Sequence, residues 1–148
     1  RLGYGGAERA HNLSAYEVII IASLIEAEAK EDEDRPKIAR VIYNRLNDGE
    51  SLGIDATLIY GKQVRGEPPT REELDTPGPY NTRDTNNPNL PPTPIAAPGS
   101  KSLEAAMNPT EGPWKYYVLK DERFHAFSET LEEHNLRKAE AAELGLLG

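Results

Sequence analysis

The segment that most constrains this chain is a short apolar run placed directly after a helix-start signal. Ser14 and Glu17 have the spacing of a capping box, in which each side chain bonds the backbone of the other residue. Residues 18–25 follow and are apolar apart from Ser23. Because a helix of that composition has no polar face, the pattern predicts a helix to about residue 29 that is buried at the centre of the fold.

Further signals divide the rest of the chain into short elements. The expected elements are a helix from near Pro36 to a stop at Gly49, a short helix after the capping box Thr70–Glu73, a helix capped by Ser100 or Ser102 that runs through Met107, strands at 115–119 and 124–127, and a final helix from the capping box Thr130–Glu133. This order predicts an α+β fold that is mainly helical, with a small β-hairpin beside the central helix.

Prolines are concentrated in one part of the chain. Nine of the twelve lie between Pro68 and Pro98, and residues 76–98 show neither helical nor strand periodicity. A long irregular segment inside a compact domain is usually functional or disordered. The stiffness of proline and the aromatic Tyr80 favour an ordered loop that lines a groove. We therefore expect a single domain over residues 13–148, with residues 1–12 as a linker or lead-in.

Composition excludes several classes of protein and site. Seventeen Lys and Arg against twenty-five Asp and Glu give a net charge of −8, which argues against a nucleic-acid surface. With no cysteine there is no disulfide framework, thiolate metal site or cysteine nucleophile. His11, His125 and His134 lack metal-ligand spacing, so no metal ion or other cofactor is expected. The apolar run at 18–25 is also far too short to span a membrane.

Glu26 is the first candidate for chemistry. It stands in the last third of the apolar helix, where desolvation would raise its pKa and let it act as a general acid. The alternative is a narrow polar stripe that only solvates the helix. Glu28 competes with it, and two residues correspond to roughly 200° of helix rotation, so the two carboxyls face opposite ways. Periodicity does not decide between them, although the small residues Ala22 and Ser23 leave more room beside Glu26.

Two other groups have a chemical and a structural interpretation. Asp55 could be the second carboxylate of a glycosidase, or it could be the N-cap of the short apolar stretch that follows it. Tyr80-Asn81-Thr82 could hold a sugar, with the ring stacking and the amide bonding hydroxyls. Asn and Thr are equally suited to simple turns.

Several short motifs occur in one order along most of the chain. They are Ala22–Ala29, Tyr43–Leu46, Asp55 with Thr57–Gly61, Pro79–Thr82, Leu90–Pro92 with Pro94–Ala96, Ser102–Ala106 with Asn108–Pro109, and Phe127–Thr130 with Glu133–Asn135. In this order and spacing the chain resembles the endolytic murein transglycosylases, the YceG-like proteins.

The resemblance implies a bacterial lyase of the EC 4.2.2 type that cuts peptidoglycan glycan strands internally. It would cleave between N-acetylmuramic acid and N-acetylglucosamine and leave 1,6-anhydro ends. Glu26 is the position that we match to the catalytic glutamate of the family. The substrate-binding residues would be Ser23, Arg45, Asp55, Thr57, Tyr60, Tyr80, Asn81 and Thr82.

The same resemblance implies a cellular context. Members normally carry an N-terminal membrane anchor and a small LysM-like domain, with the catalytic part outside the cytoplasmic membrane. Partners would be glycan strands and proteins of wall synthesis. This chain departs from the family pattern at Gly53-Ile54, Arg83 and Thr93. Two alternatives stay open: a muramidase-type hydrolase that uses Glu26 and Asp55, and a wall-binding domain without activity.

Overall fold

The computed structural model describes residues 13–62 and 67–147. The linker expected at residues 1–12 lies outside the described residues. The elements are α2 (Ala15–Glu28), the 3₁₀ turn η1 (Asp32–Asp34), α3 (Arg35–Asn47), α4 (Asp55–Gly61), α5 (Arg71–Asp75), α6 (Ser100–Met107), β1 (Tyr116–Leu119), β2 (His125–Ser128) and α7 (Leu131–Glu143). This is the mainly helical α+β architecture that the sequence predicts.

Helix α2 is the centre of the core, as expected. Its capping box is formed, with Glu17 N–H donating to Ser14 Oγ at 3.2 Å and Ser14 N–H donating to Glu17 Oε1 at 2.9 Å. Residues 18 and 20–25 are buried, and Ile19 alone in this run is exposed. The helix packs against α3, α4 and α6. Burying so many aliphatic side chains at about 25 cal/mol per Å² makes this packing the main source of stability.

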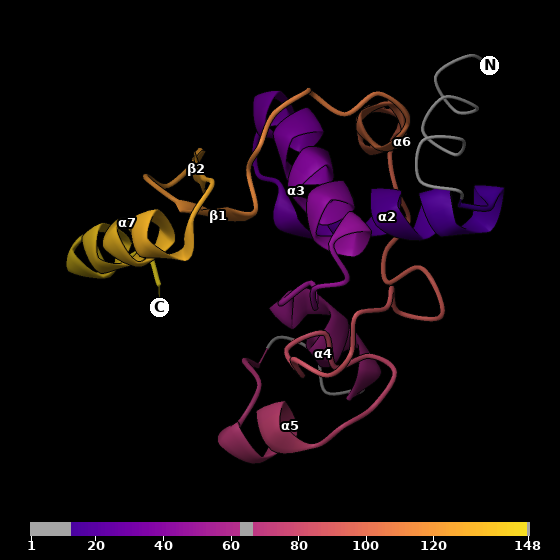
Figure 1. Cartoon of the computed structure of the whole chain (residues 1–148), viewed down its shortest axis with the longest axis horizontal. Helices are drawn as coiled ribbons and strands as arrows, with labels where there is room; N and C mark the ends of the chain where they lie inside the picture. The colour runs from indigo at the N-terminus through magenta and orange to yellow at the C-terminus, as the bar shows by residue number, and fades with distance from the viewer. Residues whose placement is uncertain (1–12, 63–66, 148) are drawn as a thin grey trace.

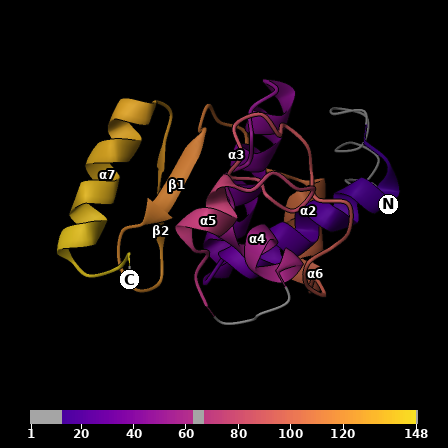
Figure 2. The ribbon, with the colours of Figure 1, turned by 90° about the horizontal axis from the view of Figure 1, so that it is seen from below.

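The hairpin and the last helix form a second layer. Strands β1 and β2 are antiparallel, with Tyr117 paired with Phe127 in the register. Helix α7 contacts both strands, and α3 contacts β1. Figures 1 and 2 show the hairpin and α7 on one side of α3, with α2 and α6 on the other side. A site that uses side chains from both α2 and the hairpin must therefore lie where these two layers meet beside α3.

Two predicted helix caps are wrong. Helix α6 has Gly99 at its N-cap rather than Ser100 or Ser102, because the carboxylate of Glu26 accepts the Gly99 N–H from outside the helix. Helix α4 has Ile54 at its N-cap, and Asp55 is its first residue with no capping bond. The Asp55 carboxylate bonds Arg83 instead, at 2.7 Å.

The proline-rich segment is an ordered loop without helix or strand between residues 76 and 99. Three buried anchors hold it. The Ile95 N–H donates to Ser23 Oγ on α2 at 3.0 Å, and the Asn81 amide donates to Thr76 O at 2.8 Å. Thr82 O accepts the Gly53 N–H at 2.7 Å. The loop is thereby tied to both α2 and the start of α4. Among the described residues, no helix has the length and apolar character needed to cross a bilayer.

Candidate active site

Glu26 lies at the N-terminus of α6. Its Oε1 accepts hydrogen bonds from Gly99 N–H at 3.0 Å and Ser102 Oγ at 2.8 Å, and Arg35 Nη1 lies 3.5 Å away. The Gly99 and Ser102 bonds, aided by the Arg35 charge, hold the pKa of this carboxyl below its usual value. A carboxylate at a helix N-terminus is also favoured by the helix dipole. Glu26 therefore acts as an ionised cap that ties α6 to α2.

The raised pKa that the sequence predicts for Glu26 is wrong, and the group that has it is Glu28. Glu28 ends α2 on its opposite side, where burial raises the pKa of the carboxyl. The Tyr117 hydroxyl donates to Glu28 Oε1 at 2.6 Å and offsets part of this effect. The nearby Asp55 charge raises the pKa further, and Arg83 lowers it. A carboxyl in such surroundings favours its neutral form more than a free carboxyl does, and the neutral form is the one that a general acid needs.

Glu28 lines a cleft of about 270 Å³. Its walls come from the end of α2, from α3, from the turn before α4, from the proline-rich loop after α5, from β1 and from α7. The lining residues are Glu28, Val41, Arg45, Leu52, Gly53, Arg83, Lys115, Tyr116, Tyr117, Leu131, His134 and Lys138. One carboxyl, two tyrosines and four cationic side chains thus share a single open cavity.

Two of the expected substrate-binding residues lie at this cleft. Arg45 lines it, and its guanidinium donates to Ser51 O at 2.9 Å and Lys115 O at 2.8 Å while lying over the Tyr116 ring. Asp55 reaches the cleft through its ion pair with Arg83. Arg45 therefore links two walls of the cleft through Ser51 and Lys115. Its guanidinium forms no ion pair with a carboxylate of the described residues.

Four other expected residues are buried and hydrogen-bonded inside the fold. Thr57 Oγ1 lies within 3.0 Å of Ile54 O, Tyr80 O and Thr82 Oγ1, and Thr82 Oγ1 accepts the Ile54 N–H at 2.9 Å. Ser23 and Asn81 bond the loop as described above. The polar atoms of these side chains are used to fix the loop against α2 and α4, so their contribution to the cleft is to position Arg83 and Asp55.

Tyr60 and Tyr80 lie apart from the Glu28 cleft. Their rings are 5.5 Å apart, and the Tyr80 hydroxyl bonds Thr93 Oγ1 at 2.7 Å. Tyr80 lines a separate, mostly apolar hollow with residues of α4 and α5. At Gly61 a Cβ atom would come within 2.7 Å of Tyr80 Cβ, so glycine permits this close packing.

Sequence reasoning missed several cleft residues. Tyr117 comes from a strand 89 positions after Glu28, and His134 and Lys138 come from α7. One usable signal was present: the residues three and four positions before Glu28 are Ile25 and Leu24, which are large and buried. Large apolar neighbours indicate a desolvated carboxyl, whereas we expected the small neighbours of Glu26 to mark the site.

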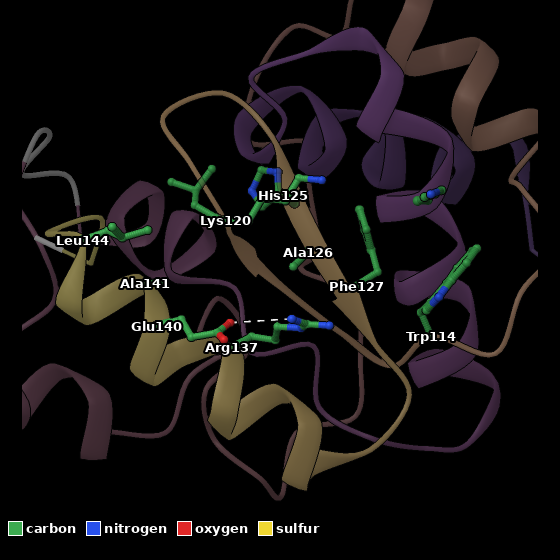
Figure 3. Close-up of a pocket in the computed structure, with 11 residues that line it drawn as sticks. Trp114, Lys120, His125, Ala126, Phe127, Arg137, Glu140, Ala141 and Leu144 are labelled. Atoms are coloured by element: carbon green, nitrogen blue, oxygen red, sulfur yellow. Dashed lines mark ion pairs between the residues drawn. The ribbon is translucent and has the colours of Figure 1, made fainter.

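A larger cavity, about 490 Å³, is lined by the hairpin, the segment before it, α3 and α7 (Figure 3). Its one carboxylate, Glu140, is paired with Arg137 at 3.6 Å. His125 at its edge bonds the buried Asp34 through both backbone and ring nitrogen. Because the carboxylate and the histidine of this cavity both have internal partners, size alone does not make it the better candidate.

Comparison with known proteins agrees with the motif pattern. The sequence model of the YceG-like family matches residues 4–140. An endolytic murein transglycosylase of Bacillus subtilis is 37% identical over 135 residues, covering 91% of this chain and 37% of that protein. The protein of the same name in Streptococcus pneumoniae is 33% identical over 120 residues, covering 78% of this chain and 21% of that protein.

A solved structure has the same fold. The crystal structure of a YceG-like protein from Listeria monocytogenes superposes with a TM-score of 0.77 at 36% identity, over 91% of this chain and 43% of that one. The chain thus spans less than half the length of each of these proteins.

Proposed function

The chain belongs to the YceG-like family, and from this premise we propose that it is the catalytic part of an endolytic murein transglycosylase. The substrate is the glycan strand of peptidoglycan. The reaction cleaves the bond between N-acetylmuramic acid and N-acetylglucosamine within the strand and leaves a 1,6-anhydromuramic end. It acts outside the bacterial cytoplasmic membrane, where its substrate lies, and no cofactor takes part.

The observation that carries this proposal is the state of Glu28. A half-buried carboxyl with a raised pKa, oriented by the Tyr117 hydroxyl at 2.6 Å, lies at the edge of an open cleft. Glycosidic bond cleavage needs a proton donor that is neutral before the reaction and a stable anion after the proton leaves. Glu28 meets both requirements, since Tyr117 donates to the carboxylate form and burial favours the acid form.

The mechanism needs one carboxyl. The protonated Glu28 gives its proton to the glycosidic oxygen, and the bond from C1 of the muramic residue to that oxygen breaks. The Glu28 carboxylate then takes the proton of the muramic C6 hydroxyl, and O6 forms a bond to C1. The ring closes, the acid is regenerated and no water is consumed. Tyr117 and Arg45 orient the acid and the cleft wall.

This assigns the acid-base role to Glu28, whereas the motif match points to Glu26. Glu26 is ionised, accepts two hydrogen bonds and supports α6. A proton donor in that position would lose, each time it is protonated, the charge that strengthens its bonds to Gly99 and Ser102. The assignment to Glu26 stays a prediction from the motif, and the two assignments differ in what their variants do.

A hydrolase is the second candidate, because the Asp55 charge acts on Glu28. In that enzyme a second carboxylate would activate water or attack the sugar, and the product would be a reducing end. Asp55 is already bound to Arg83 at 2.7 Å, so a water molecule or a sugar carbon would have to compete with this ion pair.

The deciding experiment is mass spectrometry of products from purified peptidoglycan, with wild type, Glu28→Gln and Glu26→Gln in parallel. We expect anhydro ends from wild type and from Glu26→Gln, and none from Glu28→Gln. Reducing ends would support the hydrolase. Cleavage by Glu28→Gln together with none by a folded Glu26→Gln would return the acid-base role to Glu26. Binding of glycan strands without cleavage would favour a wall-binding domain.

A further inference from the structure

The cleft beside Glu28 has a charge opposite to that of the whole chain. The net charge of the protein is −8, yet four cationic side chains and a single carboxyl line this cavity. Lys115 is neutralised by Asp48 at 2.6 Å and Glu50 at 2.8 Å. The other three cations are Arg45, Arg83 and Lys138, and among the described residues they form one ion pair, between Arg83 and Asp55.

Two of the guanidinium groups meet over a glycine. A Cβ atom at Gly53 would lie 3.5 Å from Arg83 Nη1 and 3.8 Å from Arg45 Nη2. Gly53 has φ +66°, a conformation that glycine adopts without strain. The turn before α4 therefore brings two like charges to the same backbone position. Such an arrangement is costly in isolation and becomes favourable when an anion binds between the charges.

The α7 side of the cleft contributes the cation Lys138 and a histidine. His134 stacks on Tyr116 with ring centroids 4.9 Å apart, and its buried Nδ1 has no hydrogen-bond partner in the described part of the chain. Burial lowers the pKa of His134, and the charges of Lys138, Arg45 and Arg83 lower it further. The imidazole is therefore neutral in a place where three cations converge.

We propose that Arg83, with Arg45 and Lys138, forms a subsite that binds a carboxylate carried by the glycan strand next to the bond that is cleaved. Arg83 contributes most, because its Nε bonds Asp55 while no described residue bonds its two terminal nitrogens. A guanidinium held by one carboxylate can bind a second one in bidentate fashion. Asp55 thereby positions Arg83.

Two carboxylates of the substrate have this chemistry. Stem peptides carry carboxylates, and the lactyl group of muramic acid carries one that is free when no peptide is attached. The inference rests on the proposed function, since both groups belong to the muramic residue. It adds a specificity that neither the family nor its relatives' names state.

The test measures kcat and KM for wild type, Arg83→Gln and Arg71→Gln. Arg71 is a matched control, because it also pairs with an aspartate on the surface, Asp75, but lies on α5 away from the cleft. The substrates are glycan strands with intact stem peptides, strands freed of peptide by an amidase, and strands whose carboxylates have been converted to amides.

We expect Arg83→Gln to raise KM about tenfold on at least one carboxylate-bearing substrate and to leave KM on the amidated strands within about twofold. A rise in KM only on strands with intact stem peptides identifies the peptide carboxylate. A rise only on strands freed of peptide identifies the lactyl carboxylate. An unchanged KM on both would overturn the inference. An equal rise on the amidated strands would also do so, because it indicates a structural effect.

Failure of the proposed function would look different. If wild type yields no anhydro ends from any substrate, the catalytic proposal fails. The subsite is then judged by calorimetric titration of uncleaved strand fragments into wild type and Arg83→Gln. About tenfold weaker binding of the carboxylate form by Arg83→Gln alone supports the subsite, and equal affinities refute it.

Discussion

Replacing the two glutamates of α2 one at a time should give opposite effects on stability and activity. In Glu26→Gln the amide keeps an oxygen that can accept from Gly99 and Ser102, but the charge is lost. Each charge-assisted hydrogen bond then weakens by about 0.5–1 kcal/mol. A third of the side chain is exposed, so screening reduces the sum to about 1 kcal/mol. For a domain of this size, a loss of about 1 kcal/mol lowers Tm by about 3 °C.

Glu28→Gln should leave Tm unchanged or raise it at neutral pH. The amide oxygen can still accept the Tyr117 hydroxyl, and the amide cannot ionise, so the site carries no cost of ionisation as the pH rises. Because the acid is lost, we expect turnover to fall by a factor of about 100 or more.

The pH dependence has opposite signs for the two residues. Glu26 has a lowered pKa, so its stabilisation is complete above pH 4.5 and fades as the pH falls through that pKa. Glu28 has a raised pKa, so its stabilising effect is present below pH 4.5 and is lost as the pH rises through the folded-state value. Thermal unfolding of wild type and both variants, followed by circular dichroism across this range, measures both.

One result would refute this reasoning. If Glu26→Gln unfolds like wild type at pH 7 but makes no anhydro ends, while Glu28→Gln is destabilised and active, then the roles are reversed. The Tyr117 contact would in that case be a structural tie, and Glu26 would be the acid-base residue.

Three further substitutions test the surroundings of the cleft. Tyr117→Phe removes a hydrogen bond that lowers the pKa of Glu28, so the alkaline limb of the pH–rate profile should move to higher pH and kcat should fall about tenfold. Thr82→Val leaves the buried Ile54 N–H without an acceptor and should cost about 1–3 kcal/mol in urea unfolding. Gly53→Ala forces a side chain into positive φ and should cost about 1–2 kcal/mol in the same assay.

Local signals predicted most of the fold. The three capping boxes at Ser14, Thr70 and Thr130 are all formed, because each depends on residues within one turn. The hairpin strands lie within one residue of their expected positions for the same reason. The start of a helix cannot be predicted from local sequence when its capping group comes from a distant residue. At the start of α6 the Gly99 N–H donates to the carboxylate of Glu26, 73 residues away in the sequence.

The site was harder to predict than the fold. The sequence pointed to α2 and to both candidate glutamates, but it could not predict their pKa values, which depend on contacts made from elsewhere. Glu26 is ionised because α6 docks on it, and Glu28 is desolvated because the hairpin covers it. In the sequence, Arg83 stands out only as a departure from the family pattern. Its ion pair with Asp55 could not be predicted because the two residues are 28 positions apart.

The distance along the chain between Glu28 and the groups that cover it sets an order of events during synthesis. Tyr117 follows Glu28 by 89 residues, and the α7 wall comes later still. A nascent chain that has completed only α2–α6 presents Glu28 to water, where an ordinary carboxyl is ionised at neutral pH and cannot donate a proton. If Glu28 is the acid, as proposed, its raised pKa therefore arises only with the last quarter of the polypeptide, and the chain cannot cleave glycan strands until its folding is nearly complete.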